Sequence, residues 1–166
     1  GNETTRVVVT ITDTGADVDV EGDEAGLTAR VRSRISDIAA AARMARMSVG
    51  GVPVIERQAP VLHFAGKAVT PPPGAFLQAV PQAEQAMIDL VTAALGKPKN
   101  VGDLFCGLGT LALPIARKAR VMAFDSDRVA IDALNDAQRK NQGLKPITAR
   151  VRDLFQDPLA PLEMKD

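Results

Sequence analysis

The chain has 166 residues, of which 20 are acidic and 20 are basic, and hydrophobic residues make up 46% of it. This composition predicts a folded chain of one domain, or of one small domain and part of another. A single cysteine and a single histidine argue against a disulfide framework and against a metal centre. Without a long apolar run or a signal peptide, we expect a soluble cytoplasmic protein that does not enter a membrane.

The first 70 residues predict a small α+β domain with mainly antiparallel strands. The segment "RVVVTITDTGADVDVEG" alternates apolar and polar residues around Thr14-Gly15, which is typical of a hairpin. An amphipathic helix follows, because apolar residues recur at helical spacing at Leu27, Val31, Ile35, Ile38 and Ala42. Two extended runs then flank Gly50-Gly51, and "PVLHFAGKAVT" predicts a further hairpin that turns near Ala65-Gly66.

Charge is unevenly distributed in this region, although the net charge of the chain is zero. Residues 1–25 hold seven acids and one base, whereas residues 28–57 hold two acids and six arginines: Arg30, Arg32, Arg34, Arg43, Arg46 and Arg57. A basic face of this kind could contact the phosphates of RNA, although a run of charge is more often a solvated face. Since tryptophan and tyrosine are absent, we do not expect an aromatic platform for stacking bases.

Residues 71–99 are expected to be a connector and a helix that lead into a second fold. "TPPPGAF" is stiff and non-helical, which places the boundary at about residues 70–75. The helix is expected over 81–95, with Pro81 in its first turn.

Residues 100–166 predict the first part of a Rossmann-like α/β fold. Strands "VGDLF", "RVMAF" and "ITARV" alternate with helices expected at about 108–118 and 126–141. Such alternation is typical of a parallel, doubly wound sheet. The fold class is therefore α/β: a partial Rossmann-like sheet preceded by the small α+β domain.

The carboxyl ends of these three strands carry the candidate site. Gly107 and Gly109 follow the first strand, where backbone can approach a ligand at the start of a helix. Asp125 ends the second strand, at the place of an acid that binds ribose hydroxyls, and Asp153 at the end of the third could accept from the amine of adenine. Two alternatives stay open: the glycines form only a packing corner, and Asp125 or Ser126 only caps the next helix.

Three stretches resemble the RNA uracil-5 methyltransferases, which use S-adenosylmethionine. "DLFCGLGTLALPIA" is similar to their first cofactor motif, and "PPPGAFLQAVPQAEQAM" to the phenylalanine–x–glutamine stretch before it. "VMAFDSDRVAIDALNDAQRKN" is similar to their second strand and its helix. The resemblance covers about residues 70–155 and implies methylation of carbon 5 of a uridine in ribosomal or transfer RNA. It also implies that Gly107 and Gly109 shape the cofactor loop, and that five residues contact S-adenosylmethionine: Gln78, Phe105, Thr110, Asp125 and Asp153.

Cys106 is not expected to be the nucleophile of such a reaction. It lies inside the cofactor loop, whereas the family's nucleophilic cysteine and general base lie further along the chain, which places them beyond Asp166. We therefore expect an internal fragment that binds the cofactor weakly and is inactive alone. Two alternatives remain: a fragment of a nicotinamide-dependent oxidoreductase, against which the missing third glycine argues, and a non-catalytic RNA-binding module.

Overall fold

The computed structural model describes residues 5–78, 80–160 and 163. Their backbone forms two compact units, one from residues 1–62 and 70–75 and the other from residues 63–69 and 76–166. The hairpin of β5 (Leu62–Phe64) and β6 (Lys67–Val69) is tied to helix α4 (Arg128–Lys140) of the second unit. Asn141, which follows α4, donates to the carbonyl of Ala68 at 2.8 Å and accepts from its amide at 3.1 Å.

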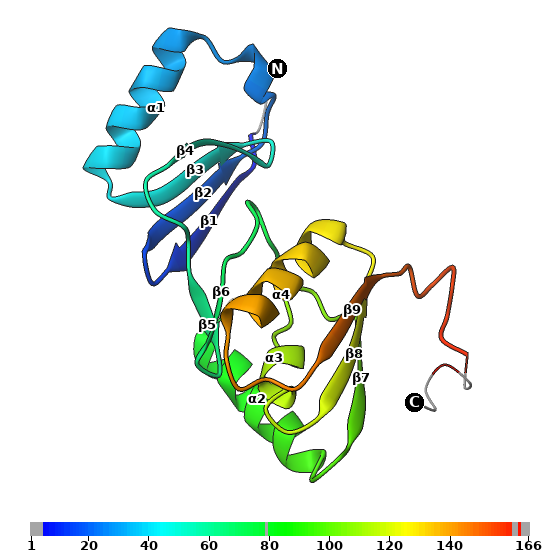
Figure 1. Cartoon of the computed structure of the whole chain (residues 1–166). Coiled ribbons are helices and arrows are strands. Elements are labelled where there is room, and N and C mark those ends of the chain that lie inside the picture. Colours follow the sequence, from blue (N-terminus) through cyan, green and yellow to red (C-terminus); the bar gives the residue numbers. More distant parts are fainter. Residues whose placement is uncertain (1–4, 79, 161–162, 164–166) are drawn as a thin grey trace. The chain divides into compact units, whose positions relative to one another are not determined.

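The first unit is a four-stranded sheet with one helix. The sheet has the order β1 (Val7–Thr12), β2 (Gly15–Val20), β3 (Met44–Val49), β4 (Val52–Glu56). A short 3₁₀ turn (Glu24–Gly26) and helix α1 (Ala29–Ala41) connect β2 to β3, and α1 packs on β3 and β4 (Figure 1). The hairpins β1–β2 and β3–β4 are antiparallel, as expected, but β2 and β3 are parallel because α1 returns the chain to the starting end of the sheet.

Arg46 corrects the expectation of a continuous basic face. Its guanidinium forms a bidentate pair with Asp17, with Nε to Oδ1 at 2.8 Å and Nη2 to Oδ2 at 2.6 Å. The same Nη2 donates to the carbonyl of Pro71 at 2.8 Å, and the two paired side chains are only 5% and 3% exposed. Arg46 thus joins two strands to the connector and is not available to a phosphate.

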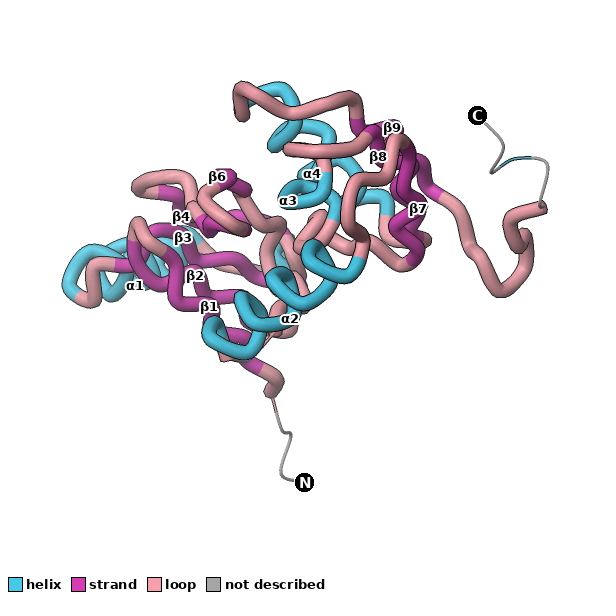
Figure 2. The backbone as a smooth tube through the Cα atoms, turned by 90° about the horizontal axis from the view of Figure 1, so that it is seen from below, coloured by secondary structure: helices cyan, strands magenta, loops and turns pink. Residues whose placement is uncertain are grey.

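The second unit is built on a parallel sheet of β7 (Asn100–Leu104), β8 (Arg120–Asp125) and β9 (Ile147–Val151), in that order. Val101, Val121 and Ile147 stand in register across the three strands and face the helices. Helices α3 (Ala112–Ile115) and α4 lie on one side of the sheet (Figure 2), and helix α2 (Pro81–Ala94) packs against α3. Partial Rossmann-like architecture is therefore confirmed.

Most predicted elements of this unit are within two residues of the observed ones, but the helix expected at 108–118 is wrong in length. Only α3 (Ala112–Ile115) is α-helical, and the residues on either side of it form turns. The late start of the helix is explained by Gly109, whose φ of +88° is incompatible with a right-handed helix. In the described ranges, no helix is both long and apolar enough to cross a membrane.

Candidate functional site

A pocket of about 190 Å³ opens at the carboxyl end of β7. Its lining comes from the segment before α2, from α2, from the end of β7 and from the loop after β7: Phe76, Leu77, Gln78, Met87, Asp103, Leu104, Phe105, Cys106, Gly107, Leu108, Thr110 and Leu111. The structure therefore gathers four of the predicted site residues around one cavity: Gln78, Phe105, Gly107 and Thr110. Gly109, Asp125 and Asp153 are not part of the lining.

The loop between β7 and α3 turns through three left-handed residues. Phe105, Gly107 and Gly109 have φ values of +60°, +51° and +88°. The amide of Cys106 donates to the carbonyl of Phe124 at 3.0 Å, and the amide of Gly109 donates to the carbonyl of Cys106 at 2.9 Å. These bonds fold the loop back over the end of the sheet.

The two glycines have different roles in this loop. A Cβ on Gly107 would meet no atom within 4 Å, so the space in front of its backbone is open. A Cβ on Gly109 would lie 2.4 Å from Cδ1 of Leu134, a fully buried residue of α4. The packing-corner interpretation therefore holds for Gly109, whereas Gly107 leaves room for a ligand.

Asp125 lies next to the pocket and holds its loop. Its Oδ2 accepts from the amide of Gly107 at 2.8 Å, and its Oδ1 accepts from the amide of Asp127 at 2.9 Å. The cap of α4 is Asp127, whose carboxylate accepts from Val129 and Ala130. Each oxygen of Asp125 keeps a further lone pair for a ligand hydroxyl.

Asp153 shapes the loop after β9. Its Oδ1 accepts from the amides of Phe155 at 3.0 Å and Gln156 at 3.3 Å. This turn presents Phe155, which is 88% exposed and whose ring centroid lies 5.3 Å from that of Phe105. An exposed pair of phenylalanine rings thus stands at the edge of the sheet.

Asp103 is a site residue that the motif reasoning missed. It is 8% exposed, it lines the pocket, and its buried Oδ2 has no hydrogen-bond partner among the residues that the structure describes. Burial raises the pKa of Asp103 to about 6, opposed by a hydrogen bond from the backbone of Ala112 and assisted by the charge of Asp125. The sequence does contain a signal for Asp103, since it is an acidic residue on the inward side of an otherwise apolar strand. Buried acids are rare without a partner, so an acid at such a position indicates a functional site.

Cys106 has no feature of an activated nucleophile. Its side chain is 6% exposed, and burial, together with the nearby carboxylates of Asp103 and Asp125, raises the pKa of its thiol to about 12. Because the thiolate is the reactive form, a raised pKa disfavours Cys106 as a nucleophile at neutral pH.

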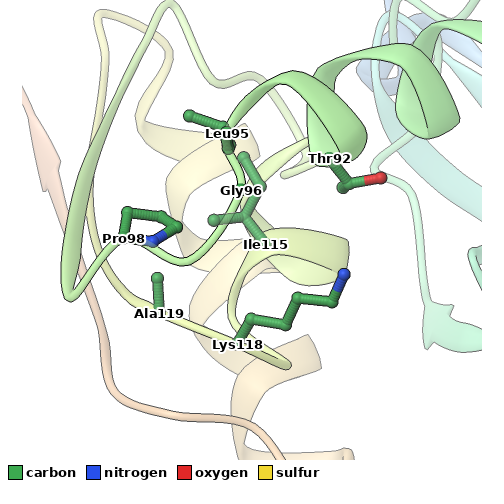
Figure 3. A pocket seen from close by; sticks show the side chains of 7 residues that line it. All are labelled: Thr92, Leu95, Gly96, Pro98, Ile115, Lys118 and Ala119. Atoms are coloured by element: carbon green, nitrogen blue, oxygen red, sulfur yellow. The ribbon is translucent and has the colours of Figure 1, made fainter.

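A second hollow in this unit is too small to bind a cofactor. Its volume of about 10 Å³ leaves room for about one water molecule. Figure 3 shows its lining, which comes from the end of α2, the following turn and the region of α3: Thr92, Leu95, Gly96, Pro98, Ile115, Lys118 and Ala119.

Comparison with curated proteins finds relatives along nearly the whole chain, although no family model matches. The chain is 48% identical over 160 residues, 96% of its length, to an uncharacterised RNA methyltransferase of Rhizobium meliloti. It is 31% identical over 94 residues, 55% of its length and 21% of the relative's, to the 23S rRNA (uracil(1939)-C(5))-methyltransferase of Aeromonas hydrophila. The chain spans only 38% of the length of the Rhizobium protein.

A solved RNA methyltransferase has a similar fold to this chain. The tRNA (uracil-54, C5)-methyltransferase of Pyrococcus abyssi, solved with S-adenosyl-L-homocysteine, matches with a TM-score of 0.65 at 16% identity over 87% of this chain and 38% of that one. At this identity the likeness shows a shared fold. Together with the sequence relatives, it confirms the resemblance to RNA methyltransferases that the motifs indicated.

Proposed function

Since the chain is homologous to part of proteins named RNA methyltransferases, we propose that it supplies the cofactor-binding part of an S-adenosylmethionine-dependent enzyme. The proposed reaction is methylation of carbon 5 of a uridine in ribosomal or transfer RNA. The observation that carries the proposal is the pocket that brings "GAFLQ" and "DLFCGLGT" together at the end of β7. Relatives named for uracil C5 methylation support the choice of atom.

The residues around the pocket fit a nucleoside with an amino-acid tail. Asp125 offers two carboxylate oxygens to the ribose hydroxyls while it holds Gly107 in place. The other carboxylate oxygen of Asp153, Oδ2, is proposed to accept from the adenine amine, beside Phe105 and Phe155. Gln78 and Thr110 add polar groups on the pocket wall.

Asp103 would balance the charge of the amino-acid tail. It is the single carboxylate among the described residues of the pocket lining, and its Oδ2 lacks a donor. An ammonium group is the donor that restores a buried carboxylate to its ionised form. We therefore add Asp103 to the proposed cofactor-binding residues.

S-adenosylmethionine, when bound, supplies an electrophilic methyl group. The resemblance assigns the activation of the uracil ring to a cysteine thiolate that adds to carbon 6 and to a base that removes the proton from carbon 5. Cys106 does not suit that role, because its thiol is buried and burial raises its pKa. The proposed role of this chain is to bind and orient the methyl donor.

Calorimetric titration of the 166-residue chain with S-adenosylhomocysteine tests the cofactor assignment, with NAD as the competing ligand. We expect binding of the first, at least a ten-fold loss in Asp125→Ala, and no binding of NAD. The control is Asp136→Ala, which removes an exposed acid from the far part of α4. Binding of NAD in place of S-adenosylhomocysteine would support the oxidoreductase alternative.

The target atom is tested with the longest natural form of the protein and RNA that carries tritium at carbon 5 of uridine. Methylation at that carbon releases the tritium to water in a one-to-one ratio with methyl groups incorporated. Methyl incorporation without tritium release would contradict carbon 5 while leaving the cofactor assignment intact.

A further inference from the structure

Strand β1 exposes a row of apolar side chains at the edge of the four-stranded sheet. Val7, Val9 and Ile11 are 52%, 56% and 77% exposed. β1 pairs only with β2, and in the described part of the chain no strand pairs with its other edge. Isolated exposed apolar residues are common, but a row of three on one strand marks an interaction surface.

These side chains belong to the apolar face of the sheet. The register places Val9 opposite Val18, with Val7 opposite Val20 and Ile11 opposite Ala16. The helix on the sheet, α1, packs over β3 and β4 (Figure 1), and the described residues leave the three side chains on β1 more than half exposed. The opposite face carries the Asp17–Arg46 pair and the connector.

The backbone of the same three residues is also unpaired. The carbonyl of Arg6 accepts from the amide of Glu21 at 2.9 Å, which fixes the alternation of the antiparallel ladder. Val8, Thr10 and Thr12 therefore bond to β2, and the amides and carbonyls of Val7, Val9 and Ile11 point away from it. An incoming strand would meet hydrogen-bonding groups and apolar side chains together.

Edge strands of completed sheets are usually protected against pairing. Lysine, proline, inward charges and bulges are the common devices, and "VVVTIT" contains none of them. The absence of charge on β1 also disfavours RNA as the occupant, because RNA binding relies on cationic side chains.

We propose that the outer edge of β1 and its apolar row form the docking site for a β-strand from the portion of the longer protein that this chain does not span. The relatives support this occupant, since 62% of the length of the Rhizobium protein lies outside the 38% that is matched. A strand, unlike a helix, satisfies the outward amides and covers the side chains at once. The inference goes beyond the proposed methylation and does not depend on it.

Amide hydrogen exchange of Val7, Val9 and Ile11 tests the proposal, in the 166-residue chain and in the longest natural gene product that contains it. We expect fast exchange in the isolated chain and at least a hundred-fold slower exchange in the longer form. Fast exchange in both would overturn the proposal. Slow exchange in the isolated chain together with a doubled mass in light scattering would overturn it in favour of pairing between two copies.

A pair of matched variants adds a second readout. Val9→Lys and Val52→Lys each place a cation on a half-exposed valine, on β1 and on the opposite edge strand β4. Val9→Lys should lower the melting temperature of the longer form by roughly 5 °C more than that of the isolated chain. Val52→Lys should affect both forms equally, and an equal effect of Val9→Lys in both would contradict the proposal.

Discussion

The carboxylate of Asp125 and the amide of Gly107 are joined by a hydrogen bond of 2.8 Å between the end of β8 and the loop after β7. The same carboxylate also accepts from Asp127 at the start of α4. One side chain thus fixes the loop that lines the pocket and the turn that precedes the next helix. Its proposed role toward a ligand and its role in the fold are therefore separable only by careful substitution.

Asp125→Asn is the substitution that separates them. The amide keeps the shape and one acceptor oxygen but loses the charge and one of the two bonds, so the chain should lose about 1–2 kcal/mol of unfolding free energy. Affinity for S-adenosylhomocysteine should fall by at least ten-fold in calorimetry. Unchanged affinity in a folded variant would limit Asp125 to the structural role.

The two glycines of the loop should respond differently to alanine. Gly109→Ala should cost roughly 2–4 kcal/mol, because its Cβ would press on buried Leu134 at a positive φ. Gly107→Ala should cost only about 1–2 kcal/mol, since it meets strain but no neighbour. Urea unfolding measures both, and equal losses would contradict the division of roles.

Asp103 should make stability depend on pH. Its pKa is about 6 in the folded chain against an ordinary value of 3.8, so the folded state binds the proton more tightly. The stabilising contribution is complete below about pH 4 and is lost as the pH rises through 6, by on the order of 3 kcal/mol. In Asp103→Asn this loss should be absent. Urea unfolding of both proteins at pH 4 and pH 7.5 gives the difference, and parallel curves would contradict it.

The same carboxyl should make ligand affinity depend on pH in the opposite direction. An ammonium group binds the ionised form, so affinity for S-adenosylhomocysteine should weaken as the pH falls from 7.5 to 5. The control is 5′-methylthioadenosine, which lacks the amino-acid tail and should bind equally at both values. Calorimetry at the two pH values checks this, and an equal pH dependence for the two ligands would assign it to another group.

Removing one partner of the buried Asp17–Arg46 pair should be costly. Arg46→Met leaves the carboxylate of Asp17 buried without its partner and should cost roughly 3–5 kcal/mol. Arg34→Met, on the exposed surface of α1, should change the unfolding free energy by less than about 0.5 kcal/mol. A loss for Arg46→Met as small as that for Arg34→Met would show that the pair contributes little.

The sequence by itself determined the order of elements and the family resemblance. Alternation of apolar residues, the stripe of α1 and the strand–helix order of 100–151 depend on local patterning, which neighbouring residues set. The positions of glycine and proline likewise predicted the turns and the connector, because these residues restrict or free the backbone locally. The quoted motifs were enough to indicate a resemblance to RNA methyltransferases, and the sequence relatives confirm that resemblance.

Tertiary structure alone decided the contacts between residues distant in the chain. The basic run gave no sign that Arg46 is buried against Asp17, because the pairing joins strands 29 residues apart. Leu134, which is 25 positions further along the chain, leaves no room for a side chain at position 109, so that a glycine is required there. The parallel pairing of β2 with β3 depends on how α1 packs. Nor could the sequence show that Oδ2 of Asp103 lacks a donor, since burial and satisfaction of polar atoms arise only when the chain has folded.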